Sequence, residues 1–181
     1  SRTRTAAGLL RSLKLTSIQT LELNGCPWVN DDLLLHLQAY STLQSLELSG
    51  TQITDEGVRL LLKLPDLRWL NLSDCGAIGT ESLSMLSGVP SLRHLNISGH
   101  NLSVEAAFRF QKSRPSTTLN IPLNEFPEMA PILERSERAQ EVLFIHGLQS
   151  LSVHDATGVD YSVLKQFPEL RTLHLTGRGL N

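Results

Sequence analysis

The sequence predicts an α/β repeat protein, a stack of short units that each contain one strand and one helix. Leucine makes up 36 of the 181 residues, about a fifth of the chain, whereas aromatic residues make up only 5%. The pattern L-x-x-L-x-L begins at positions 18, 43, 67 and 92, so its spacing along the chain is almost constant. A fixed period of this length is typical of repeat architectures.

Each copy of the pattern predicts a strand, because a leucine at every second position gives one buried and one exposed face. A degenerate fifth copy begins at position 116, and two further copies begin at positions 148 and 170. The seven predicted strands are residues 18–23, 43–48, 67–72, 92–97, 116–121, 148–153 and 170–175.

A helix is predicted after each of the first four strands, because apolar residues there recur at helical spacing, as in Leu33, Leu34 and Leu37. Each helix is preceded by a residue that can accept a hydrogen bond from a free backbone N–H group. The predicted helices are Asp31–Tyr40, Asp55–Lys63, Glu81–Ser87 and Val104–Lys112. The expected N-cap residues are Asn30, Thr54, Thr80 and Ser103.

Residues 43–58, Leu-Gln-Ser-Leu-Glu-Leu-Ser-Gly-Thr-Gln-Ile-Thr-Asp-Glu-Gly-Val, carry a resemblance to a known family. The segment resembles the leucine-rich repeat, in the helix-containing subtype of ribonuclease-inhibitor-like and cysteine-containing repeats, the latter common beside F-box motifs. The resemblance implies a curved α/β solenoid with a parallel concave sheet of about seven strands, convex helices and a protein partner.

We expect one domain that spans residues 1–181. Residues 1–17 are predicted to form an N-terminal cap, 18–112 the regular repeats, and 148–181 the last repeats. No helix is predicted after the last strand, so we expect the C-terminal cap to be missing and the chain to be a fragment or processed domain. An open last strand would allow end-to-end homodimers.

Residues 113–147 interrupt the repeat pattern. Prolines break this stretch, and residues 128–142 are predicted to form a charged helix. One interpretation is a single irregular repeat with a longer convex helix. The alternative is an insertion that a partner recognises.

The ninth position of the family pattern, in the turn after the strand, accounts for both cysteines. We expect a small or polar side chain there to bond the loop backbone rather than to serve redox chemistry or a metal. Two repeats separate the cysteines, a distance of about 9–10 Å at about 4.8 Å per strand, so no disulfide is expected. The residues at this position are Cys26, Thr51, Cys75, His100 and Asn124.

The outward side chains of the strands are the candidates for partner binding, because alternate residues face opposite sides of a sheet. Trp69 is a large indole among small polar groups, and tryptophan is enriched in interface hot spots. Adjacent carboxylates destabilise a bare sheet, so a basic partner would relieve the repulsion between Glu22 and Glu47. The alternative is a solvated face without a ligand. The candidate residues are Trp69, His94, Glu22, Glu47, Asn71, Asn96, His154 and His174.

Composition and motifs exclude several functions. The net charge of −2 gives no basic face for nucleic acid, and no apolar run approaches the roughly 18 residues that span a bilayer. Three histidines, His94, His154 and His174, could converge on the concave side, but no close-spaced ligand set, nucleophile elbow or phosphate-binding loop occurs. We therefore expect no enzyme, metal or cofactor. Two cysteines favour a reducing compartment, the cytoplasm or nucleus.

Two functions are compatible with these features. The first is a scaffold or adaptor that binds a protein or peptide on its concave face, as part of a larger cytoskeletal or organising protein. The alternative, implied by the family resemblance, is the substrate-recognition domain of an F-box-type ubiquitin ligase. An adjoining F-box-like helical segment would favour the second function, and coiled-coil heptads would favour the first.

Overall fold

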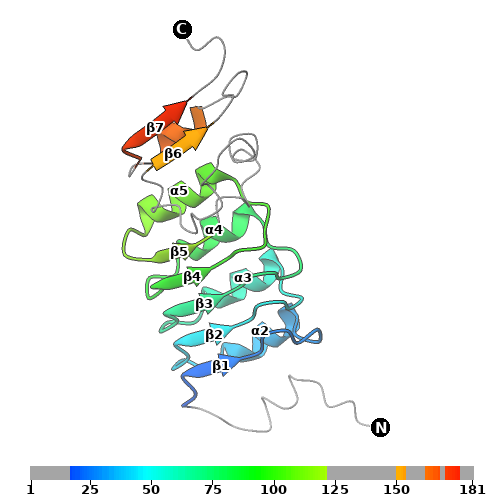
Figure 1. Ribbon diagram of the computed structural model, residues 1–181. Helices are drawn as coiled ribbons and strands as arrows, with labels where there is room; N and C mark the ends of the chain where they lie inside the picture. The colour runs from blue at the N-terminus through cyan, green and yellow to red at the C-terminus, as the bar shows by residue number, and fades with distance from the viewer. Residues whose placement is uncertain (1–16, 122–149, 154–161, 168–169, 176–181) are drawn as a thin grey trace.

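The computed structural model describes residues 17–121, 150–153, 162–167 and 170–175. Its first five strands form one parallel sheet in the order β1-β2-β3-β4-β5, with helices stacked along one side (Figure 1). The strands are β1 Thr20–Glu22, β2 Ser45–Glu47, β3 Trp69–Asn71, β4 His94–Asn96, β5 Thr118–Asn120, β6 Ser150–Val153 and β7 Thr172–Leu175. The helices are α2 Asp31–Leu37, α3 Asp55–Leu61, α4 Thr80–Leu86, α5 Val104–Ser113 and the 3₁₀ helix η5 Ser162–Gln166.

The core is the space between this sheet and the helices. Leu46, Leu70 and Leu95 are paired in register on β2, β3 and β4, and each side chain is at most 1% exposed. Leu48 and Leu72 fill the next inward position and are fully buried. The predicted alternation of inward leucines with outward polar residues is therefore confirmed for these strands.

The helix starts agree with the prediction only in part. Thr54 and Ser103 each accept a hydrogen bond from the first turn of α3 and α5, at 3.2 and 3.1 Å. Asn30 precedes α2 but makes no side-chain cap bond. The prediction of Thr80 as a cap was wrong by one position, because α4 begins at Thr80 itself and its N-cap is Gly79.

Carboxylates of one repeat bind the helix start of the next. The Asp31 carboxylate accepts hydrogen bonds from the Thr54 amide and hydroxyl, at 2.9 and 2.6 Å. The Asp55 carboxylate accepts from the Gly79 amide at 2.9 Å and from the Ser82 hydroxyl. A free N–H group at the start of α4 is thus satisfied by the neighbouring repeat, which explains why a glycine suffices there.

Buried polar side chains occupy the turns after β2, β3 and β4, and two of them bond the preceding repeat. Thr51 donates to the Leu48 carbonyl at 2.6 Å, and the Cys75 thiol donates to the same carbonyl at 3.2 Å. The His100 ring nitrogen Nε2 lies 2.8 Å from the Leu72 carbonyl. The structural role predicted for this position is confirmed for these three residues, whereas Asn124 lies outside the described residues. Both cysteines are free thiols.

The last two strands form a sheet of their own. All seven predicted strand positions are strands, but β6 and β7 pair with each other and not with β5 among the described residues. The expectation of one wall shared by all seven strands was therefore wrong. Leu173, predicted to point inward on β7, is 42% exposed. A two-stranded sheet buries little apolar surface by itself, which is consistent with this exposure.

Packing between helices joins the two sheets. Leu164 and Phe167, in and just after η5, belong to the same buried cluster as the inward leucines. The rings of Phe108 on α5 and Phe167 meet edge to face, with centroids 5.3 Å apart. Most of the predicted cap (1–17) and of the irregular segment (113–147) lies outside the described residues, as does much of the last segment (148–181).

Substitution of the inward leucines should destabilise the fold strongly. Leu70→Ala and Leu95→Ala should each lower the free energy of unfolding by about 2–5 kcal/mol, because each leaves a cavity in a fully packed core. Leu62→Ala, at a side chain that is 41% exposed, should change it by no more than about 0.5 kcal/mol. Urea unfolding measures all three. Equal effects at positions 62 and 70 would refute the inward assignment.

The two cysteines should differ in reactivity in the folded protein. Burial raises the pKa of the Cys75 thiol, which reduces the population of its reactive thiolate, whereas Cys26 is only partly buried. Iodoacetamide at pH 8 should therefore label Cys26 faster than Cys75, with mass spectrometry following each site. In urea the two rates should become similar. Faster labelling of Cys75 in the native protein would contradict the buried turn described above.

Candidate functional site

The candidate site is the outward face of β1 to β5, here called the concave face. Parallel pairing in register arranges its side chains in two rows across the sheet. The first row is Thr20, Ser45, Trp69, His94 and Thr118. The second row is Glu22, Glu47, Asn71, Asn96 and Asn120.

A hollow of about 250 Å³ opens on this face near its N-terminal end. Its lining residues are Glu22 from β1, Ser45 and Glu47 from β2, and Trp69 from β3. Ser45 is in register with Trp69, so a small side chain stands directly beside the large indole. The hollow exists because the first row changes abruptly in size at this point, from hydroxyl-bearing residues to tryptophan.

The two carboxylates of the hollow differ in how firmly they are held. Glu47 is partly buried, and its two oxygens accept hydrogen bonds from the Asn71 amide at 3.0 Å and from the Ser49 backbone amide at 3.1 Å. Glu22 is exposed and has no hydrogen-bond or ion-pair partner within the part of the chain that the structure describes. The Glu47 carboxylate is therefore held in one position, whereas the Glu22 carboxylate can reorient.

Among the described residues, no positive side chain lines the hollow. Glu22 and Glu47 are direct neighbours on parallel strands, where like charges repel. The ion pairs found in the described part of the chain lie on the helices instead and involve Arg59 and Arg109. The electrostatic field of the hollow is therefore that of two carboxylates, with Asn71 offsetting it by hydrogen bonding.

The side chains of Asn71 and Asn96, in the second row, form hydrogen bonds within the protein. The Asn71 side-chain oxygen accepts from the Ser73 backbone amide at 3.0 Å, while its nitrogen is taken by Glu47. The Asn96 oxygen accepts from both the amide and the hydroxyl of Ser98, at 3.2 and 2.9 Å. Both amides thus cap the end of their own strand.

Two of the three predicted histidines are described, and they lie in different sheets. His94 is exposed beside Trp69 on β4, whereas His174 belongs to β7 in the other sheet. His154 lies outside the described residues. Within residues 17–121 and the shorter described segments, no three His, Cys, Asp or Glu side chains are grouped so as to hold a metal ion. The structure thus places His94 and His174 in different sheets, and the convergence of the three histidines stays a prediction.

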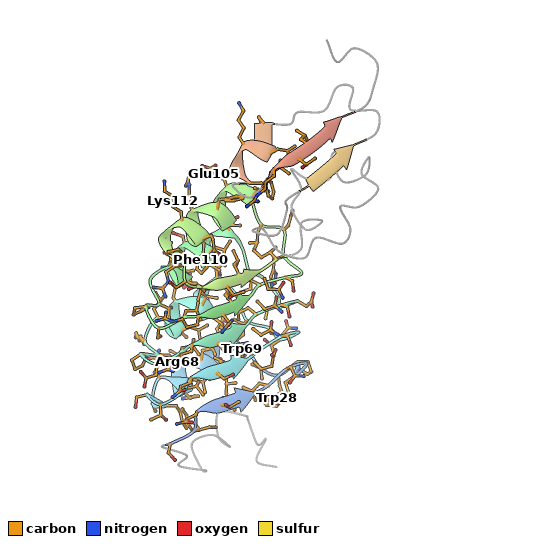
Figure 2. The ribbon with its side chains drawn as sticks, turned by 60° about the vertical axis from the view of Figure 1, so that its left-hand side comes forward. Trp28, Arg68, Trp69, Glu105, Phe110 and Lys112 are labelled. Carbon is orange, nitrogen blue, oxygen red and sulfur yellow. The ribbon has the colours of Figure 1, made fainter. Side chains whose placement is uncertain are left out.

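The sequence reasoning missed two residues, one that lines the hollow and one exposed tryptophan that lies outside it. Ser45 lines the hollow, but as one of several small residues in its row it carried no distinguishing signal. Trp28 is 55% exposed on the loop between β1 and α2. It could have been noticed, because it lies outside the leucine pattern and has no inward role there. Figure 2 shows Trp69 over the sheet and Trp28 beyond the end of β1.

The side chains of the hollow offer several groups for binding. The hollow combines an aromatic surface, two carboxylates and a hydroxyl. In the described part of the chain no helix has both the length and the apolar character needed to cross a membrane. The side chains of this face can therefore recognise another molecule by charge, stacking and hydrogen bonds.

Comparison with a known sequence family agrees with this architecture. Residues 6–143 match the family described as FBD-associated F-box protein At5g56370, LRR repeats. No curated protein matches the chain significantly. A solved structure, internalin C2 from Listeria monocytogenes, is similar at 17% identity and a TM-score of 0.45 over 88% of this chain, which spans about half (52%) of that protein. Because the family match covers well over half of its length, the chain belongs to the leucine-rich repeat proteins, in the group of F-box-associated repeats.

Proposed function

We propose that this domain recognises a protein or peptide partner on its concave face, with Trp69 as the central anchor. The observation that carries the proposal is the position of Trp69, only partly buried beside an open hollow on a face whose other side chains are polar or charged. Tryptophan provides a large apolar contact area, and such residues dominate the energy of many interfaces.

The surroundings of Trp69 favour a face that binds another molecule over a face that contacts only solvent. Its register neighbours, Ser45 and His94, belong to β2 and β4, and Ser45 is too small to cover an indole. Asn71 and Asn96 are partly occupied in capping the ends of their own strands. Trp69 and the exposed Glu22 carboxylate keep unused binding capacity on this face.

Two cellular settings are consistent with such a face. The match to F-box-associated repeats favours the substrate-recognition domain of an F-box-type ubiquitin ligase, so that the bound partner would be marked for degradation. A scaffold in a cytoskeletal or organising assembly is the other candidate, with the same concave face but no effect on partner turnover. The free thiols Cys26 and Cys75 support a location in the reducing cytoplasm or nucleus for either.

Trp69→Ala should weaken partner binding while Trp28→Ala does not. Loss of an interface anchor costs about 2 kcal/mol or more, or about a 30-fold loss of affinity. Trp28 is a matched control because it is the other tryptophan of the chain and lies off the concave face. Both variants should unfold at nearly the wild-type urea concentration, and quantitative capture from native extract followed by titration of the recovered partner measures binding.

Equal affinity of wild type and Trp69→Ala for that partner would refute the anchor. If Trp28→Ala alone lost binding, the interface would lie on the loops after the strands and not on the concave face. Both outcomes are readable in the same titration, because the three proteins are compared with one partner.

The half-life of the captured partner in cells distinguishes the ubiquitin ligase from the scaffold. If the domain serves a ubiquitin ligase, depletion of the full-length protein should raise the partner's half-life, and re-expression of the Trp69→Ala form should not restore turnover. Cycloheximide chase measures the half-life. An unchanged half-life with intact binding would contradict the ubiquitin-ligase function and favour the scaffold function.

A further inference from the structure

We infer that the hollow lined by Glu22, Ser45, Glu47 and Trp69 binds the side chain of an arginine in the partner. This inference rests on the proposed function and specifies the chemistry that the concave face recognises. It combines three independent properties of the hollow, namely its charge, its aromatic wall and its size.

The charge of the hollow favours a cation. Two carboxylates from adjacent strands lie in one depression that no positive side chain of its described lining neutralises. Arg68 precedes Trp69 in the chain, but it forms no ion pair with Glu22 or Glu47 among the described residues. A bound cation would therefore remove the repulsion between the carboxylates and gain the attraction of both.

The arrangement of hydrogen-bond acceptors fits a guanidinium group better than an ammonium group. Glu47 is already fixed by Asn71 and by the Ser49 amide, so it offers only its remaining lone pairs. Glu22 is free to rotate towards the ligand. A guanidinium has five N–H donors in a planar fork and can serve two carboxylates at once, whereas an ammonium is a single compact charge.

The indole adds a planar wall. Trp69 stands on β3 beside the short side chain of Ser45, which leaves room next to the ring. Arginine stacks its planar guanidinium on aromatic faces, and tryptophan is the best partner for such cation–π contacts. The same side chain can thus satisfy the carboxylates along its edge and the indole through its face.

The hollow is large enough to receive a single side chain. Its volume of about 250 Å³ lies below the range of about 300–1,000 Å³ of pockets that enclose drug-sized ligands. The hollow is also one depression in a longer polar face, so the rest of the partner can continue across β4 and β5. A peptide that presents one arginine fits both features.

Titration with a short peptide followed by NMR tests the inference on the intact chain. The probes are the blocked peptide Gly-Ser-Arg-Ser-Gly and its twins with citrulline or lysine in place of arginine. Citrulline has nearly the shape of arginine without the charge. The two indole N–H signals report on the site and on its surroundings at once, with Trp69 in the hollow and Trp28 as an internal reference outside it.

The arginine peptide should shift the Trp69 signal saturably and leave that of Trp28 in place. The citrulline peptide should bind at least about tenfold more weakly, and the lysine peptide should lie between them. Glu22→Gln should weaken arginine binding by about threefold or more, since it removes the unpartnered carboxylate. Glu56→Gln, the same charge change on the opposite helical side, should have no effect.

Equal affinities for arginine and citrulline peptides would overturn the inference, because charge would then play no part. A saturable shift of Trp28 instead of Trp69 would also overturn it. Neither result refutes the concave face as a docking surface, which depends on the effect of Trp69→Ala on the natural partner. Loss of that effect, with arginine binding intact, would refute the proposed function alone.

Discussion

The burial of the inward leucines of each repeat in a shared core is the constraint on which the rest of the structure depends. Leu46, Leu70 and Leu95 lie in register on adjacent parallel strands and are almost completely shielded from water. Because side chains alternate along a strand, a slip by a single position would place these leucines in solvent and the outward residues in the core. The apolar column therefore fixes the register, and the register determines which residues share the concave face.

The candidate site follows from this register and not from any local motif. Glu22, Glu47 and Trp69 belong to three successive repeats and are distant from one another in the chain, yet they line one hollow because β1, β2 and β3 lie side by side. The polar contacts between repeats also hold neighbouring repeats in place. Asp31 and Asp55 each bind the next helix start, so the spacing of the units is maintained at the helices as well as at the strands.

The sequence was sufficient to predict the strands, the inward leucines and the composition of the concave face, because each depends on a period that repeats. It was insufficient where a contact joins one repeat to another. The Gly79 amide, just before α4, donates to Asp55 in the preceding repeat, and no local pattern reveals this contact. The separate pairing of β6 with β7, and the exposure of Leu173, depend on packing beyond one repeat. The hollow depends on the small size of Ser45, which is unremarkable until Trp69 stands beside it.

Nuclear Overhauser contacts between backbone protons of β2, β3 and β4 test the register most directly. The shared leucine core predicts contacts that align Leu46 with Leu70 and Leu70 with Leu95, in parallel strands, in a sample of the intact chain. Contacts displaced by a single position, or an absence of contacts between these strands, would contradict the register and separate Glu22, Glu47 and Trp69 from one another.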